Sequence, residues 1–250
     1  MSEKIALVTG GGTGIGRAAA LALAADGFTV MVCGRRQAQL DEALSSIIAA
    51  GGKGIAHVCD VARPHEVRSM FNTIRDTCGR LDFLFNNAGM GGPPVLLEDL
   101  PFEAWQSVVN VNLTGMFLCT QQAFKIMKDQ TPMGGRIVNN GSISAHTPRP
   151  NSIAYTSTKH AVTGITKASA LDGRKYNIAV GQIDIGNAES QMADKMKSGM
   201  PQPDGTIKPE ATMKLDHVAK AVAMMAALPL DSNVLTMTIK ATAMPFEGRG

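Results

Sequence analysis

The chain has 250 residues, of which 44% are apolar and 18% are charged, so it can bury a sizeable core, which excludes a disordered chain. The net charge of +3 comes without a long basic run, so we expect neither nucleic acid nor a membrane as a partner. The four cysteines lack CxxC spacing, so we expect reduced thiols and no metal site. No signal-peptide pattern precedes the first strand-like run, so we expect a cytoplasmic protein.

Short β-branched runs alternate with longer helical patterns along the whole chain. The strand-like runs are apolar on both faces, which is typical of a parallel sheet covered by helices on each side. We therefore predict one α/β domain over 1–250, with a doubly wound, mostly parallel seven-stranded sheet of Rossmann type and helices on both faces. The strands are expected at 5–9, 28–33, 54–59, 83–86, 136–139, 178–183 and 234–240, and the helices near 15–25, 37–50, 64–78, 102–128, 152–173 and 215–228.

A glycine-rich turn follows the first predicted strand and opens the first predicted helix. Its sequence, Gly10-Gly-Gly-Thr13-Gly14-Ile15-Gly16, is neither the G-x-G-x-x-G form nor a phosphate loop, since no Gly-Lys-Ser/Thr follows. Glycines let backbone N–H groups approach a pyrophosphate, and the helix N-terminus adds partial positive charge. The turn thus predicts a dinucleotide site formed by these five numbered residues. The alternative is a turn that only lets the helix pack closely.

The residues after the second predicted strand bear on which nicotinamide cofactor fits. An acidic residue here would accept hydrogen bonds from the adenosine ribose and repel a 2′-phosphate, but the sequence has Gly34 at this place. Arg35 and Arg36 follow, and a guanidinium can pair with a phosphate through charge-assisted hydrogen bonds. We therefore predict NADP as the cofactor, with NAD as the alternative. The competing interpretation is that both arginines are merely solvated at a helix start.

Two further strand ends are expected beside the glycine turn. Asp60 and Val61 follow the third predicted strand, and Asn87, Ala88 and Gly89 follow the fourth. Ligands of doubly wound sheets bind beyond the carboxyl ends of the strands. We expect the first pair to contact the adenine and the second group to contact the nucleoside backbone.

Tyr155 and Lys159 stand four residues apart in a predicted helix, so both project from one face. An ammonium that close favours phenolate over phenol, and a tyrosine so placed can donate or accept the proton that accompanies hydride transfer. Ser142 follows the fifth predicted strand, where its hydroxyl could stabilise charge on the reacting oxygen. Such pairs are common on helices, so the prediction also depends on the glycine turn. The other tyrosine, Tyr176, has no such partner.

The stretch 188–210 is long for a connection and rich in Met, Gly and Pro, which predicts a substrate lid. Methionines such as Met200 and Met213 suit either an adaptable apolar pocket or plain packing. We expect residues 93–96, after the fourth strand, to line the other side. Because few charged residues accompany these segments, we expect a neutral or mostly apolar substrate.

Three further polar residues have ordinary interpretations. His146 could reach a substrate, but a loop histidine in Ala-His-Thr-Pro is more often solvated. Asn112 and Asn140 begin N-glycosylation patterns, which we expect to be accidental in a cytoplasmic protein.

Together the motifs resemble those of the short-chain dehydrogenase/reductase family, in its short single-domain subgroup. They cover residues 5 to about 185 in the family's order and spacing. The resemblance is carried by Thr9-Gly10-x3-Gly14-Ile15-Gly16, Asn86-Asn87-Ala88-Gly89, Asn112, Ser142 and Tyr155-x3-Lys159.

The resemblance implies a catalytic tetrad. Tyr155 would be the general acid/base, Ser142 would hold the substrate carbonyl, and Lys159 would bind the nicotinamide ribose and tune Tyr155. Asn112 would keep a helix locally open around a water in the proton path. Family members are usually homotetramers or homodimers, paired through the helices that we predict at 102–128 and 152–173, so we expect the same assembly here.

Two departures from the family pattern concern the substrate side. After the sixth strand the family usually has Pro-Gly, where this chain has Ile185-Gly186, and Ile185 is the expected nicotinamide contact at this place. The tail 241–250 replaces a Gly-Gly ending and would cover a neighbouring subunit's pocket or run over its own surface.

We therefore expect an oxidoreductase that transfers a hydride between NADP(H), or NAD(H), and a neutral or apolar ketone or secondary alcohol. The alternative from another class is a catalytically silent dinucleotide-binding sensor or scaffold. The filled tetrad positions argue against that alternative.

Overall fold

A computed structural model describes residues 3–189, 199–202 and 204–247. Its main sheet contains β1 (Lys4–Thr9), β2 (Phe28–Gly34), β3 (Lys53–Val58), β4 (Phe83–Asn86), β5 (Gly135–Asn140), β6 (Ile178–Ile185) and β9 (Thr236–Ile239). The strand order is β3-β2-β1-β4-β5-β6-β9, and every neighbouring pair is parallel. The order reverses between β1 and β4, so the predicted doubly wound fold is confirmed.

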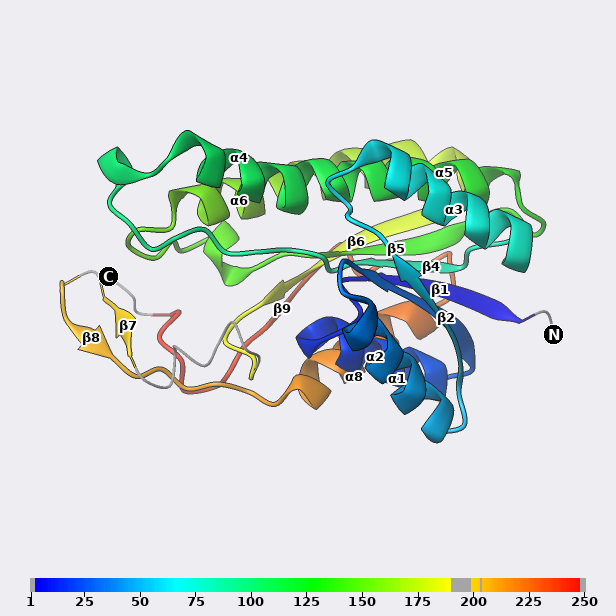
Figure 1. The fold of residues 1–250 in the computed structure, drawn as a ribbon, viewed down its shortest axis with the longest axis horizontal. Helices are drawn as coiled ribbons and strands as arrows, with labels where there is room; N and C mark the ends of the chain where they lie inside the picture. The colour runs from blue at the N-terminus through cyan, green and yellow to red at the C-terminus, as the bar shows by residue number, and fades with distance from the viewer. Residues whose placement is uncertain (1–2, 190–198, 203, 248–250) are drawn as a thin grey trace.

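Helices cover both faces of this sheet (Figure 1). One face carries α1 (Gly14–Ala25), α2 (Gln37–Ala49) and α8 (Leu215–Ala227), and the other carries α3 (Pro64–Cys78), α4 (Phe102–Val109), α5 (Met116–Asp129) and α6 (Ile153–Gly173). Within the described ranges, no helix is both long and apolar enough to cross a bilayer.

Alternate residues of each strand enter the two cores. Ala6 and Val8 of β1 pack beneath the α1 face, whereas Ile5 and Leu7 pack beneath the α3 face. Successive side chains of a strand point to opposite faces, and here both faces are covered. This is why β1 is a continuous apolar run in the sequence.

The helix predicted over 102–128 is interrupted in the structure. Asn110–Gly115 forms a π-helical turn between α4 and α5. The helical pattern continues through this turn, so periodicity predicts one uninterrupted helix, whereas the family resemblance implied a local opening at Asn112. Such turns recur at functional positions, and Asn112 lies within this one.

The predicted lid, 188–210, is described only in part, because residues 190–198 and 203 lie outside the described ranges. Its described portion contains a small antiparallel hairpin of β7 (Met200–Pro201) and β8 (Ile207–Lys208). Strands of two residues are too short to give an alternating pattern, so the sequence did not predict this hairpin.

The tail that follows β9 is described as far as residue 247. Ala241 and Met244 are buried against their own chain, and Lys240 Nζ lies 2.9 Å from a carboxylate oxygen of Glu247. The N–H of Asn187 donates to Met244 Sδ at 3.4 Å. The described part of the tail therefore packs beside the segment that follows β6.

Candidate active site

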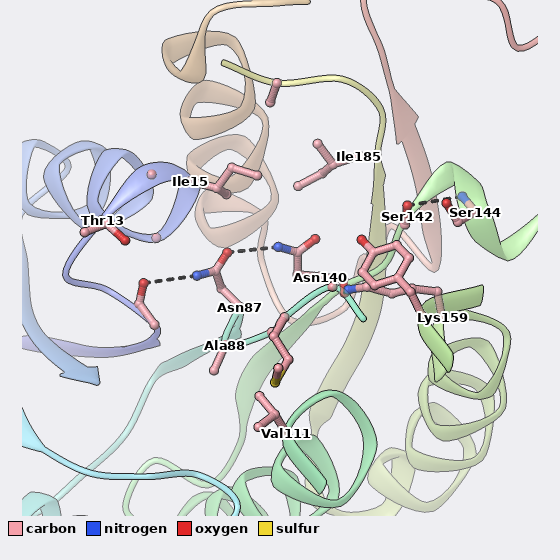
Figure 2. Close-up of a pocket in the computed structure, with 18 of the residues that line it drawn as sticks. Thr13, Ile15, Asn87, Ala88, Val111, Asn140, Ser142, Ser144, Lys159 and Ile185 are labelled. Atoms are coloured by element: carbon pink, nitrogen blue, oxygen red, sulfur yellow. Dashed lines mark hydrogen bonds between the residues drawn. The ribbon is translucent and has the colours of Figure 1, made fainter. Parts of the chain in front are cut away.

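A cavity of about 560 Å³ opens at the carboxyl ends of the central strands, a volume typical of small-molecule sites. Figure 2 shows Thr13 and Ile15 on one side, Ser142 and Lys159 on the other, and Asn87 between them. Ser142 and all the predicted cofactor contacts line this cavity, namely Gly10, Thr13, Gly14, Ile15, Gly16, Arg35, Arg36, Asp60, Val61, Asn87, Ala88, Gly89, Tyr155, Lys159 and Ile185.

The glycine-rich turn closes one end of the cavity with backbone atoms. Gly10 and Gly14 have φ angles of +63° and +52°, in the left-handed region that favours glycine. A Cβ atom on Gly16 would stand 2.2 Å from the carbonyl oxygen of Gly10 and 2.6 Å from Asn87 Nδ2. The turn can therefore be this compact only without side chains, and it brings the N-terminus of α1 to the cavity, where an anion would be stabilised.

A chain of hydrogen bonds links the glycine turn to Lys159. Thr9 Oγ1 accepts the N–H groups of Asn87 and Ala88, each at 2.9 Å, and Asn87 Nδ2 donates to the carbonyl oxygen of Thr9 at 2.9 Å. Asn140 Nδ2 donates to Asn87 Oδ1 at 2.9 Å (Figure 2). Lys159 Nζ in turn donates to the carbonyl oxygen of Asn140 at 2.6 Å.

Asn140 is a site residue that the sequence analysis missed. Its sequence context indicates only a glycosylation pattern, whereas the structure places it in the cavity wall with 9% of its surface exposed. It is the last residue of β5. The same argument from strand ends that selected Asn87 would have selected it.

Tyr155 and Lys159 lie one turn apart on α6 and both line the cavity. Lys159 Nζ is 5.5 Å from the centroid of the Tyr155 ring, and the lysine is only 6% exposed. Ser142 Oγ accepts the N–H of Ser144 at 3.1 Å (Figure 2). This bond does not use the hydroxyl hydrogen of Ser142, so that hydrogen can be donated to a ligand. The wall thus combines a phenol, an ammonium and a hydroxyl.

Asn112 is the predicted tetrad residue that does not line the cavity. It is buried in the π-helical turn, where its Oδ1 accepts the N–H of Met90 at 2.8 Å and its Nδ2 donates to the Met90 carbonyl at 2.9 Å. Nδ2 also lies 3.2 Å from Thr158 Oγ1 on α6. Asn112 therefore joins the loop after β4, which lines the cavity, to the helix that carries Tyr155.

Arg35 and Arg36 reach the cavity at the end of β2 as exposed side chains. Neither has an ion-pair partner among the described residues, so their charges are available to an anion. Gly34 beside them leaves room, since its nearest neighbour would be a Leu40 methyl 3.6 Å from an added Cβ.

A buried ion pair that the sequence did not predict lies beside the cavity, where Arg149 and Asn187 form part of the wall. Arg149 Nη1 donates to Glu210 Oε1 at 2.7 Å, and Asn187 Nδ2 donates to Glu210 Oε2 at 2.8 Å. Gln202 Nε2 adds a bond of 3.0 Å from the β7–β8 hairpin. Burial alone would raise the pKa of Glu210, but these hydrogen bonds and the charge of Arg149 lower it to about 2. We name these four residues the Arg149–Glu210 cluster.

A second polar cluster lies directly behind Ser142. Asp184, at the end of β6, is 1% exposed, and its Oδ1 accepts the backbone N–H of Ser142 at 3.0 Å. Its Oδ2 lies 2.9 Å from His146 Nε2. His146 therefore faces Asp184 and does not line the cavity. Within the described ranges, no group of three or more His, Cys, Asp or Glu side chains could hold a metal ion.

Comparison with known proteins assigns this arrangement to a family. The family model described as short chain dehydrogenase matches residues 4–201. The chain belongs to the short-chain dehydrogenase/reductase family. The resemblance expected from the sequence motifs is thereby confirmed, as is the class of enzyme, a nicotinamide-dependent oxidoreductase.

Among its relatives in this short-chain dehydrogenase/reductase family is a 3beta-hydroxysteroid dehydrogenase from Mediterraneibacter gnavus, which is 36% identical over 77% of this chain and 69% of the relative. A 3-ketoacyl-(acyl-carrier-protein) reductase from Brucella melitensis, solved with NADH, has a TM-score of 0.85 at 26% identity over 96% of this chain and 98% of that one. A metagenomic short-chain oxidoreductase, solved with NADP, has a TM-score of 0.81 at 25% identity over 95% and 96%.

Proposed function

We propose that this short-chain dehydrogenase/reductase transfers a hydride between NADP(H) and a neutral or apolar ketone or secondary alcohol, with Tyr155 as general acid/base. The observation that carries the proposal is that Tyr155, Lys159 and Ser142 line the same cavity as the glycine turn, with Lys159 Nζ 5.5 Å from the centroid of the Tyr155 ring. NAD(H) remains the alternative cofactor.

The cavity's chemistry fits a nicotinamide dinucleotide. A Cβ on Gly16 would collide with Gly10, so the turn keeps a backbone cradle for a pyrophosphate at the N-terminus of α1. Arg35 and Arg36 supply two guanidinium groups without ion-pair partners among the described residues, which favours a 2′-phosphate and hence NADP. The solved neighbours with NADP and with NADH are consistent with either dinucleotide.

The proposed proton transfer uses three side chains of this chain. When bound, the nicotinamide supplies or accepts the hydride. Tyr155 would give its hydroxyl proton to the carbonyl oxygen in reduction and take it back in oxidation. Ser142 would donate a hydrogen bond to the same oxygen as negative charge develops there. The Lys159 ammonium, held by the Asn140 carbonyl at 2.6 Å, would stabilise negative charge on the phenol oxygen.

The proposed substrate class follows from the charge on the substrate side. Arg149 lines the cavity, but its guanidinium is paired with Glu210, so the two together add no net charge. Gly92, Pro94 and Met200 add uncharged surface. The 3beta-hydroxysteroid dehydrogenase among the relatives acts on a substrate class of the apolar kind proposed here.

We also propose that the chain assembles as a homotetramer or homodimer through the α4, α5 and α6 layer. Three large apolar side chains on these helices are exposed in the single chain: Phe102 by 68%, Phe117 by 50% and Leu171 by 60%. Large exposed apolar side chains on these helices support an interface. Light scattering would give the mass directly, and a monomer at micromolar concentration would contradict the proposal.

The experiment that tests the catalytic role is Tyr155→Phe. NADPH oxidation is measured over a panel of aliphatic, cyclic and acyl-thioester ketones, and the best substrate is used for the variant. Turnover should fall by about 10²–10⁴-fold, the usual contribution of a general acid/base, while NADPH still binds. Tyr176→Phe is the matched control, because Tyr176 lies outside the cavity. Unchanged turnover in Tyr155→Phe on a verified substrate would exclude the proposed role.

A further inference from the structure

We propose that Asp184 is a positioning residue that fixes Ser142 relative to the helix that carries Tyr155. The proposal rests on the role of Ser142 proposed above and adds a residue that acts through it. Its basis is the buried carboxylate at the end of β6, which holds the Ser142 peptide, the Gln182 amide and the His146 ring together.

A carboxylate at this place must have a structural reason. Asp184 is 1% exposed, and burying a charge is costly unless it is fully hydrogen-bonded. Burial of an apolar residue of similar size would usually cost less free energy. The last β5–β6 backbone bond runs from the N–H of Gly141 to the carbonyl of Ile183, so the next N–H, that of Ser142, needs a side-chain acceptor. Asp184 Oδ1 is that acceptor, at 3.0 Å.

The same oxygen connects Ser142 to helix α6. Gln182 Nε2 donates to Asp184 Oδ1 at 2.6 Å, and it also lies 3.2 Å from Thr163 Oγ1. Thr166 Oγ1 donates to Gln182 Oε1 at 3.2 Å. Both threonines belong to α6, the helix of Tyr155. The carboxylate therefore relates the serine at the end of β5 to the helix with the phenol.

The backbone before Ser142 is shaped around the carboxylate. A Cβ atom on Gly141 would stand 2.0 Å from Asp184 Oδ1, so the carboxylate occupies the space of a side chain at position 141. The φ angle of Gly141 is not in the left-handed region, so the requirement for glycine is one of space. Gly141 and Asp184 are thus complementary, and together they place the Ser142 peptide.

The second oxygen of Asp184 fixes the turn after Ser142. His146 Nε2 lies 2.9 Å from Asp184 Oδ2, and the His146 ring contacts Phe246 of the tail edge to face, with centroids 6.4 Å apart. His146 is also hydrogen-bonded through its N–H to the Ile143 carbonyl at 2.9 Å. Asp184 therefore holds both ends of the short turn that Ser142 begins.

The expected consequence is a loss of turnover without a loss of cofactor binding. The direction of the Ser142 hydroxyl depends on its peptide, and a shift of about 1 Å at a reacting centre can reduce rate by about 100-fold. The glycine turn and Arg35 also line the cavity, but the hydrogen bonds of Asp184 among the described residues go to Ser142, His146 and Gln182.

The test compares Asp184→Ala with Asp184→Asn, using NADPH and cyclohexanone, or the fastest ketone of the panel. Asp184→Ala should lower kcat by about 10- to 100-fold, with the NADPH Kd unchanged within about twofold. Asp184→Asn keeps an oxygen for the Ser142 N–H and should restore kcat to within about threefold. Asp82→Ala is the matched control. Asp82 also accepts a backbone N–H, that of Ile5 at 2.9 Å, but it lies at the amino end of the sheet, away from the cavity. It should lower Tm and leave kcat unchanged.

A second variant, His146→Phe, tests the same role of Asp184 if Asp184→Ala does not fold. His146→Phe retains a ring against Phe246 and removes only the bond to Asp184, and it should lower kcat by about 3- to 10-fold. Unchanged kcat in Asp184→Ala, or in His146→Phe if the alanine variant is insoluble, would overturn the proposal, as would an Asp184→Asn variant as slow as Asp184→Ala. Tyr155→Phe is measured beside them. If it stays active, the proposed function itself fails, and if it alone is inactive, only the role of Asp184 fails.

Discussion

The two ends of the cavity are built by different means. The proposed cofactor end consists of short contiguous motifs whose backbone atoms and small residues form the surface, as at Gly10 to Gly16. The proposed substrate end depends on side chains from distant segments: Arg149 lines the cavity, and Glu210 behind it holds Arg149 through hydrogen bonds and an ion pair. The comparison indicates that added volume at the first end should weaken cofactor binding. Loss of a charge at the second end should lower the stability of the fold.

The largest effect is expected at the proposed cofactor end, from Gly16→Ala. The added methyl would stand 2.2 Å from the Gly10 carbonyl oxygen. Because that neighbour is backbone, we expect NADPH affinity to fall by about 100-fold, at the upper end of overpacking costs. Fluorescence titration with NADPH measures the dissociation constant of each variant. Gly164→Ala on α6, where an added Cβ meets nothing within 4 Å, is the control, and equal affinities in the two variants would contradict the backbone cradle.

An intermediate effect is expected at the substrate end, from Glu210→Gln. The pKa of Glu210 is lowered to about 2 from an ordinary 4.5, so its ionised form stabilises the fold above pH 4.5, and this contribution is lost as the pH falls towards 2. At pH 7 the variant should lose about 2 kcal/mol of unfolding free energy, less than the full pKa shift implies because glutamine keeps part of the hydrogen bonding, while NADPH affinity stays the same.

Urea unfolding at pH 7 and at pH 3 measures the difference between Glu210→Gln and the unchanged protein. The difference should shrink at pH 3, because below pH 4.5 the Glu210 carboxyl of the unfolded chain is protonated while the native carboxylate stays mostly ionised, so part of the stabilisation is lost. Glu247→Gln is the control, since the Glu247 side chain is 73% exposed and its ion pair with Lys240 should contribute nothing measurable. A difference of the same size at both pH values would show that the charge of Glu210 is not what stabilises the substrate end.

The smallest effect is expected from Arg35→Ser, which tests cofactor choice and leaves the shape of the cavity alone. Loss of one charge-assisted contact should lower the ratio of kcat/KM with NADPH to kcat/KM with NADH by about 10-fold. Arg68→Ser, on an exposed position of α3, should leave the ratio unchanged. An unchanged ratio in both Arg35→Ser and Arg36→Ser would favour NAD over NADP.

The same contrast explains what the sequence could predict. All seven strands of the main sheet and the glycine turn were predicted, because each is encoded by neighbouring residues with a local pattern. Arg149 with Glu210, and Ser142 with Asp184, are 61 and 42 residues apart. No local pattern marks such pairs, and only the fold brings them together. Asn140 is a different case. It directly follows a predicted strand, so its position alone was sufficient to identify it as a site residue.

The complementary fit of Gly141 and Asp184 has an evolutionary consequence. Since the carboxylate lies where a residue-141 side chain would be, neither position can change its side-chain volume alone without a collision or a void. Homologues with alanine or serine at position 141 should therefore carry a smaller residue at position 184, and homologues with an acid there should keep the glycine. An ancestral lineage that exchanged the two residues would have had to pass through a paired substitution or a less active intermediate.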